Sequence, residues 1–141
     1  MHKGINSAWW VLRLGLGIGP ALAGLDKIFR TNILADWSMY ISPLAAPWLP
    51  MSDAAFMQVV GVIELLVGVA ILTIAPRVGA WVAMAWLLAI AVNLASTGMF
   101  FDLAVRDVEI ALAAYALARL TAAREEAAVR AGSLQSVTHA A

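Results

Sequence analysis

The sequence predicts an all-α membrane protein, an antiparallel bundle of four transmembrane helices with an interfacial first loop. Of the 141 residues, 63% are hydrophobic and only 13% are charged, whereas a soluble globular chain carries about 25% charged residues. Four apolar stretches each approach the roughly 20 residues that a helix needs to cross a bilayer. The loops between the last three stretches are too short for anything but antiparallel neighbours.

The first predicted helix spans residues 7–29 and contains Pro20 and several glycines. Membrane helices tolerate these residues, because neighbouring groups satisfy the freed backbone. A cleaved signal peptide is an alternative for this stretch, since residues 21–23 (Ala-Leu-Ala) resemble a cleavage site. Arg13 interrupts the apolar run that such a peptide needs, so we expect an uncleaved helix.

Residues 30–53 form a long first connection, which we expect to lie at the membrane surface. Trp37, Tyr40 and Trp48 suit this position, because aromatic rings gather at the level of the lipid headgroups. We therefore interpret five tryptophans as interfacial anchors rather than as ligand contacts: Trp9, Trp10, Trp37, Trp48 and Trp81. Ser52 is a candidate N-cap for the helix that follows.

The second predicted helix covers residues 54–75 and ends before Pro76, which cannot continue it. The third covers residues 78–98 and the fourth residues 102–120, so that residues 1–120 form a single transmembrane domain. Residues 121–141 form a cytoplasmic tail, which we expect to extend the last helix and then to fray into disorder.

Lysine and arginine near the helix ends set the orientation, because they are enriched on the cytoplasmic side of membrane proteins. One side of the predicted bundle carries Lys3, Arg77, Arg119, Arg124 and Arg130, and the other carries Lys27 and Arg30. This bias predicts that both termini lie in the cytoplasm.

Composition also excludes several kinds of chemistry. The chain has no cysteine, and its two histidines, His2 and His139, lie at the termini. Thiolate ligands, dithiol redox chemistry and an intramembrane imidazole site are therefore excluded. The net charge of +0 gives no reason to expect a nucleic-acid partner. We expect no catalytic residue, no metal site and no intrinsic cofactor.

Polar side chains inside the predicted helices are the candidate site, because a charge at the bilayer centre costs about 2.5–3.5 kcal/mol on insertion scales. They are Arg13, Asp26, Lys27, Glu64, Asn93, Arg106, Asp107 and Glu109. All except Arg13 are expected at one level, in the outward half of the bilayer. Three interpretations remain open: a buried network that fixes helix packing, a docking surface for another membrane protein, or a pocket. In the pocket, Glu64 would be the protonatable group, with Arg106 or Lys27 as its partner.

Helical spacing assigns some of these residues to faces that also carry glycine. One face carries Gly61, Glu64 and Gly68, and another carries Arg13, Gly17, Pro20, Gly24 and Lys27. Because small residues allow helix backbones to approach closely, we expect both faces to point into the bundle.

Three segments resemble the DoxX-like family of small bacterial membrane proteins. They are RLGLGIGPALAGLDKIF (residues 13–29), GVIELLVGVAIL (61–72) and NLASTGMFFDLAVRDVEIALAAYALARL (93–120). The resemblance covers about residues 8–120 and implies a four-helix bundle in the bacterial inner membrane. Arg13, Lys27 and Glu64 match the family's recurring polar positions, and Asp107 matches the acidic position that opens its last helix.

The founding members of that family are described as subunits of a thiosulfate:quinone oxidoreductase, and others as parts of complexes with redox or detoxification enzymes. The resemblance therefore implies an auxiliary or anchoring subunit of a membrane redox system, with a membrane-associated oxidoreductase as partner. If it binds quinone or a similar hydrophobic ligand, Glu64 would handle the proton, and Arg106 or Asn93 would donate to a carbonyl oxygen.

Two other functions remain open from the sequence. A small solute or proton transporter would use the polar residues to line a path, and a homo-oligomer would be needed to widen it. Arg13 alone lies toward the cytoplasmic side, which argues against a continuous route. A non-catalytic assembly protein would use the same residues only for packing.

Overall fold

The computed structural model describes residues 3–140, and these residues form helices and no strands. The long helices are α1 (Lys3–Phe29), α2 (Asp53–Leu72), α3 (Pro76–Ser96) and α4 (Phe101–Ala140). Two short 3-10 helices, η1 (Trp37–Tyr40) and η2 (Ala46–Trp48), lie in the connection between α1 and α2. The prediction of an all-helical chain is therefore confirmed.

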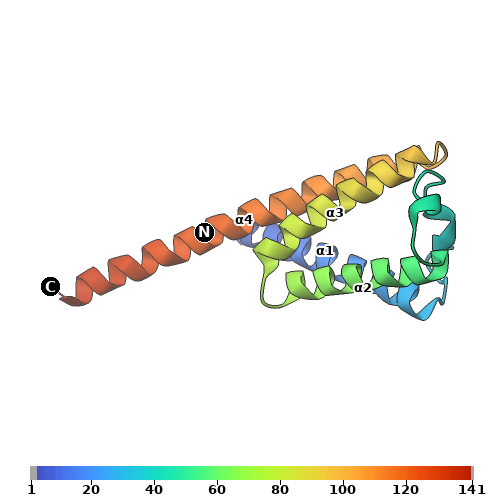
Figure 1. The fold of residues 1–141 in the computed structure, drawn as a ribbon. Helices are drawn as coiled ribbons and strands as arrows, with labels where there is room; N and C mark the ends of the chain where they lie inside the picture. The colour runs from blue at the N-terminus through green and yellow to red at the C-terminus, as the bar shows by residue number, and fades with distance from the viewer. Residues whose placement is uncertain (1–2, 141) are drawn as a thin grey trace.

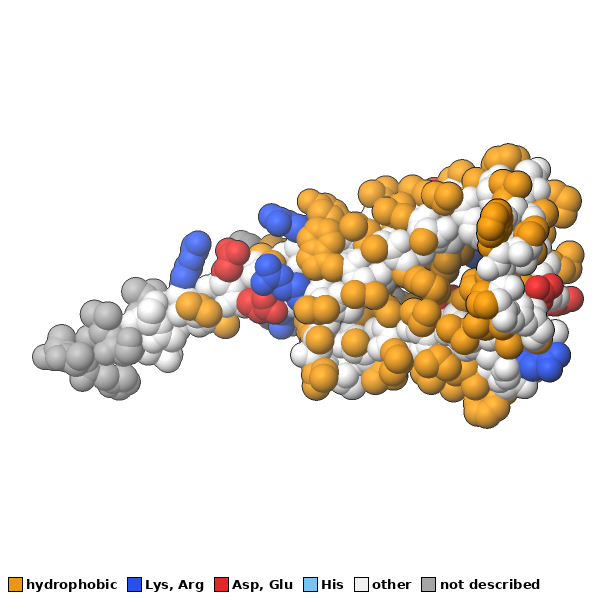
Figure 2. All heavy atoms as spheres, viewed as in Figure 1, with side chains coloured by type: hydrophobic (Ala, Val, Ile, Leu, Met, Phe, Trp, Pro, Cys, Tyr) orange, Lys and Arg blue, Asp and Glu red, His pale blue; other side chains and the backbone are white. Residues whose placement is uncertain are grey.

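Three of these helices, α1, α2 and α3, are long and apolar enough to cross a membrane. Large apolar side chains cover their outward faces: Val11, Leu66 and Val92 are 70%, 63% and 71% exposed. Figure 2 shows the resulting apolar side chains along the face of the bundle in view. Such a surface is far larger than the apolar patches of soluble monomers and indicates a membrane protein.

The four long helices are arranged as two pairs. α1 packs along α2, and α3 packs along α4 (Figure 1). The pairs meet at the end where residues 73–75 connect α2 to α3, and they diverge toward the end that the first connection covers (Figure 1). The joined end holds the main core, in which Ile71, Ala114 and Leu117 are fully buried.

Glycines allow α1 and α2 to touch backbone to backbone. A Cβ added at Gly24 would lie 2.5 Å from the carbonyl oxygen of Gly61, and one added at Gly68 would lie 2.5 Å from that of Gly17. Both distances are too short for a real Cβ, so any larger residue would force the helices apart. The prediction that the two glycine faces point into the bundle is confirmed.

The helix ends follow from local chemistry. Ser52 caps α2, as predicted, and its hydroxyl oxygen accepts a hydrogen bond of 3.3 Å from the backbone N–H of Ala55. α3 begins at Pro76, in the first turn, where a missing backbone N–H costs nothing.

The fourth helix is longer than the expected 102–120. α4 continues without a break to Ala140 and projects well beyond the other helices (Figure 1). Its alanine-rich second half favours helix. Two contacts also hold the first part of the extension: Arg124 donates to the side-chain oxygen of Asn6, and Arg77 pairs with Glu125 at 3.0 Å.

Candidate functional site

A cavity of about 630 Å³ lies between the two helix pairs, in the part of the bundle where they diverge. All four long helices and the first connection contribute to its lining. The lining residues from α1 and α2 include Leu16, Pro20, Lys27, Val60 and Glu64, those from α3 and α4 include Trp86, Ile90, Asn93, Arg106 and Asp107, and those from the connection include Trp37 and Tyr40. Most of the lining is apolar, so the few polar groups define its chemistry.

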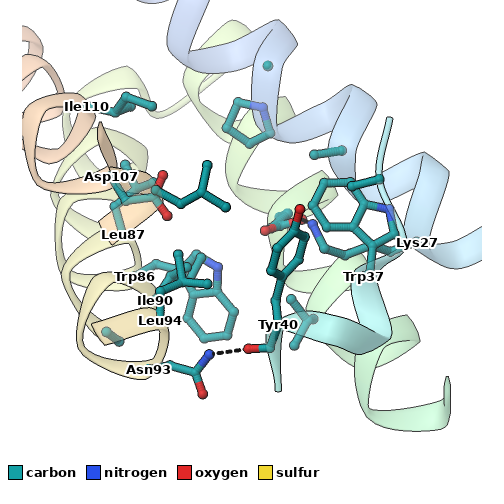
Figure 3. Close-up of a pocket in the computed structure, with 18 of the residues that line it drawn as sticks. Lys27, Trp37, Tyr40, Trp86, Leu87, Ile90, Asn93, Leu94, Asp107 and Ile110 are labelled. Carbon is teal, nitrogen blue, oxygen red and sulfur yellow. Dashed lines mark hydrogen bonds and ion pairs between the residues drawn. The ribbon is translucent and has the colours of Figure 1, made fainter. Parts of the chain in front are cut away.

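An ion pair between α1 and α2 is the centre of the polar lining. Lys27 Nζ donates to Glu64 Oε2 at 2.5 Å, and the two side chains are 5% and 9% exposed. The ring of Trp37 closes over the pair, with its centroid 3.6 Å from Lys27 Nζ. Figure 3 shows Lys27 and Trp37 together on one wall of the cavity. A buried ammonium is stabilised by both a carboxylate and an aromatic face.

A second ion pair lies on the opposite wall, within α4. Arg106 donates to Asp107 Oδ1 through Nη2 at 3.0 Å and through Nε at 3.2 Å. The Asp107 side chain is 6% exposed and points into the cavity (Figure 3). The Arg106 side chain also belongs to the lining but is 57% exposed. The cavity thus has one carboxylate on each wall, and each carboxylate has its own cation.

Two aromatic residues lie between these walls. Tyr40 reaches into the cavity from η1, and Trp86 faces it from α3 (Figure 3). The indole N–H of Trp86 is buried and has no hydrogen-bond partner among residues 3–140. It lies beside the Glu64 carboxylate, close enough for a weak hydrogen-bonding interaction, but the two groups do not form a hydrogen bond of ordinary geometry.

Asn93 holds the first connection against α3 at the end of the cavity. Its Nδ2 donates to the carbonyl oxygen of Tyr40 at 2.6 Å, and its Oδ1 accepts from the backbone N–H of Ser42 at 3.2 Å. The hydroxyl of Ser96 donates to that of Ser42 at 2.7 Å. Both ends of the Asn93 amide are therefore engaged by the loop.

Asp26 organises the start of the same connection rather than the cavity. Its carboxylate accepts from Trp37 Nε1 at 2.7 Å and from the backbone N–H groups of Ile33 and Leu34 at 3.0 and 3.2 Å. The hydroxyl of Thr31 donates to it as well. A single carboxylate thereby fixes where the chain turns after α1.

Arg13 lies at the joined end of the bundle, away from the charged groups of the cavity. It donates hydrogen bonds of 2.8 Å to the carbonyl oxygens of Ile71, Leu72 and Thr73. These carbonyls have no partner within the helix, because α2 ends there. Arg13 thus caps the C-terminus of α2, where a cation also interacts favourably with the helix dipole.

The structure brings together only part of the predicted polar set. Lys27, Glu64, Arg106 and Asp107 meet around the cavity, with Asn93 at its edge. Arg13 and Asp26 serve as caps elsewhere, and Glu109 lies on the exposed face of α4, outside the cavity lining.

Sequence reasoning missed the three aromatic residues of the site. Trp37 and Tyr40 line the cavity, although the loop aromatics were expected to be membrane anchors. Trp9 is not at the surface either: it is 5% exposed, and its Nε1 donates to Thr121 Oγ1 at 2.8 Å. One signal did exist for Trp86, which lies two turns before Asn93 and so on the same face of α3.

Comparison of the chain with protein-family models, curated proteins and solved structures gave no match. Within residues 3–140, no group of three histidine, cysteine, aspartate or glutamate side chains could hold a metal ion. The site is therefore described by its own geometry: an apolar cavity with two internally paired carboxylates, a phenol, and an indole N–H that lacks a hydrogen bond of ordinary geometry.

Proposed function

We propose that this chain is a four-span integral membrane protein that binds quinone or a similar hydrophobic ligand in its central cavity. It would serve as an auxiliary or anchoring subunit of a membrane redox system, as in the DoxX-like proteins that its sequence resembles. The observation that carries the proposal is the cavity itself. Its volume of about 630 Å³ falls within the roughly 300–1,000 Å³ of ligand sites, and its mostly apolar lining with a few convergent polar groups is typical of them.

The topology belongs to the same proposal. α4 would be the fourth span, although five charged residues lie within its first twenty. Two of these, Arg106 and Asp107, pair with one another, and Val105 and Leu112 are 60% and 64% exposed on the outer surface. The excess of lysine and arginine near the joined end would place both termini in the cytoplasm of a bacterial inner membrane.

Within the cavity, each polar group would make a different contact with the head group of a quinone. Glu64 would exchange the proton, since it is a carboxylate buried beside the ligand space. Arg106 would donate to a carbonyl oxygen, because its side chain belongs to the lining and makes contact with Asp107 only on one side. Asn93 is less suited to this role, because the loop already engages its amide.

Electrons would come from a partner, since the chain has no cysteine and no histidine outside its termini. A membrane-associated oxidoreductase would therefore be the redox partner, and the cavity would hold the acceptor. Purification of the tagged chain in mild detergent, with mass spectrometry of co-purifying proteins and lipids, tests this part. A stoichiometric oxidoreductase or a bound quinone supports it, and a lone chain that carries only phospholipid contradicts it.

Ligand-dependent stability tests the binding site directly. Decyl-benzoquinone should raise the melting temperature of the wild-type protein in detergent, and Glu64→Gln and Arg106→Ala should both lose this effect. Glu109→Gln is the matched control, because Glu109 is exposed and outside the cavity. Equal stabilisation of all four proteins would contradict the proposed site.

The alternatives predict other results. A transporter needs a path through the bundle, but the joined end is filled by buried residues such as Ile71 and Leu117, which favours binding over transport. A purely structural protein would lose stability when Glu64 is changed and would show no ligand effect in the wild type.

A further inference from the structure

The indole N–H of Trp86 is an unsatisfied donor inside the cavity. Within residues 3–140 it is the buried side-chain nitrogen or oxygen atom that lacks a hydrogen-bond partner. A buried donor without a partner costs about 1–3 kcal/mol, so proteins rarely keep one without a use. The donor borders ligand space (Figure 3). The Glu64 carboxylate lies nearby but is already paired with Lys27 and makes no hydrogen bond of ordinary geometry with the indole, so a ligand atom that accepts a hydrogen bond would satisfy the donor.

The charges around the cavity point to a neutral ligand. Lys27 pairs with Glu64, and Arg106 pairs with Asp107. These four side chains therefore sum to zero, and neither carboxylate is left to balance a ligand cation. A charged head group would have to break one of these pairs in a low-dielectric space, which is costly.

The cavity opens toward the apolar surface of the bundle. α2 and α3 are joined at residues 73–75 and diverge from there, and Figure 2 shows a hollow between them on the face that both figures share. Phe56 and Met57 of α2 and Ala89 of α3 belong to the cavity lining. In a bilayer this opening would face acyl chains, so a ligand dissolved in the lipid would reach the cavity sideways.

We propose that the ligand is a neutral, lipid-soluble molecule that enters between α2 and α3 and accepts a hydrogen bond from Trp86 Nε1. This inference rests on the proposed binding function and adds the residue that selects the head group. Trp86 discriminates between head groups that carry an acceptor and those that do not, because an apolar head would leave the N–H unpaired.

The test compares three probes that share a ten-carbon tail, measured by equilibrium dialysis with the full chain in nanodiscs. They are decyl-benzoquinone, which is neutral with carbonyl acceptors, decylbenzene, which is neutral without an acceptor, and decyltrimethylammonium, which is cationic. The wild type should bind decyl-benzoquinone best. Trp86→Phe keeps an aromatic ring and removes the N–H. It should weaken the binding of decyl-benzoquinone by about 2- to 12-fold, as expected for one hydrogen bond, and leave the affinity for decylbenzene unchanged.

Trp81→Phe is the matched control, since Trp81 lies on the same helix, packs against Tyr115 and is not part of the cavity lining. It should bind all three probes as the wild type does. Trp86→Phe should also be at least as stable as the wild type without ligand, because it removes an unsatisfied group. If Trp86→Phe does not fold, Trp86→Met, which also lacks the N–H, takes its place.

The outcomes separate the two proposals. If Trp86→Phe keeps the wild-type preference for decyl-benzoquinone over decylbenzene, or if the cation binds as well as the quinone, this inference is wrong while the cavity remains a binding site. If no probe binds the wild type, the proposed binding function fails, and this inference fails with it.

Discussion

Gly61→Ala tests the contact on which the α1–α2 wall of the cavity depends. A Cβ at position 61 would lie 2.7 Å from the carbonyl oxygen of Gly24 and 2.8 Å from the Cβ of Lys27. Ordinary contacts begin near 3.4 Å, so the backbones must separate by about 0.7 Å, and a backbone oxygen cannot turn aside as a side chain can. Overpacking of this kind costs about 1–3 kcal/mol, and it pushes directly on the residue that pairs with Glu64.

The assay is reversible unfolding in mixed micelles by titration with SDS, followed by circular dichroism. Gly19→Ala is the matched control, because Gly19 lies in α1, the helix that Gly61 of α2 contacts, and an added Cβ there meets nothing within 4 Å. The control should be neutral or slightly more stable, since alanine favours helix by up to about 1 kcal/mol. If Gly61→Ala unfolds at the same SDS fraction as Gly19→Ala, the helices are not held at backbone contact, and this account of the wall is wrong.

Three further substitutions test other parts of the fold. Lys27→Met should destabilise the chain by about 3–5 kcal/mol in the same assay, because Glu64 is left charged and unpaired; the double variant Lys27→Met/Glu64→Met should recover most of this loss, and no recovery would argue against the ion pair. Arg13→Gln should cost about 2 kcal/mol, since the carbonyls at the end of α2 lose a charged donor, and wild-type stability would exclude the capping role. Asp26→Asn should mainly loosen the first connection, so proteolysis within residues 30–52 should become several-fold faster while SDS unfolding changes little; an unchanged cleavage rate would refute this.

Periodicity was enough to predict which faces of α1 and α2 meet. The spacing of glycines around Lys27 and Glu64 placed these residues on inward faces, and the structure has them in contact. This works because a helix face is a property of local sequence, and few residues allow the closest approach of two helices.

The roles of individual charged residues could not be predicted in the same way. The expected level in the bilayer grouped Asp26 with the charged residues of the cavity. Its partners are instead backbone N–H groups a few residues further along the chain, in an irregular loop. Glu109 shares its depth with Asp107, yet two positions along a helix turn a side chain to nearly the opposite side. Which of the two points inward depends on how α4 packs against α3.

The cavity itself has no sequence signal, since it arises from the angle between two helix pairs. Trp86 lies on an inward face by spacing, but spacing does not reveal whether an inward N–H finds a partner. The unpaired state of this donor depends on the empty space beside it.

Because α4 is unbroken, two distant contacts of this helix depend on the same rotation about its axis. Asp107 and Glu125 are eighteen residues apart, which in an α-helix is five full turns and about 27 Å. The two carboxylates therefore share one angular direction: the first meets the cavity, and the second meets Arg77 at the start of α3. Any axial rotation of α4 that turned Asp107 away from the cavity would swing Glu125 off Arg77 by the same angle, so the orientation of the inner carboxylate can be read out at the end of the bundle.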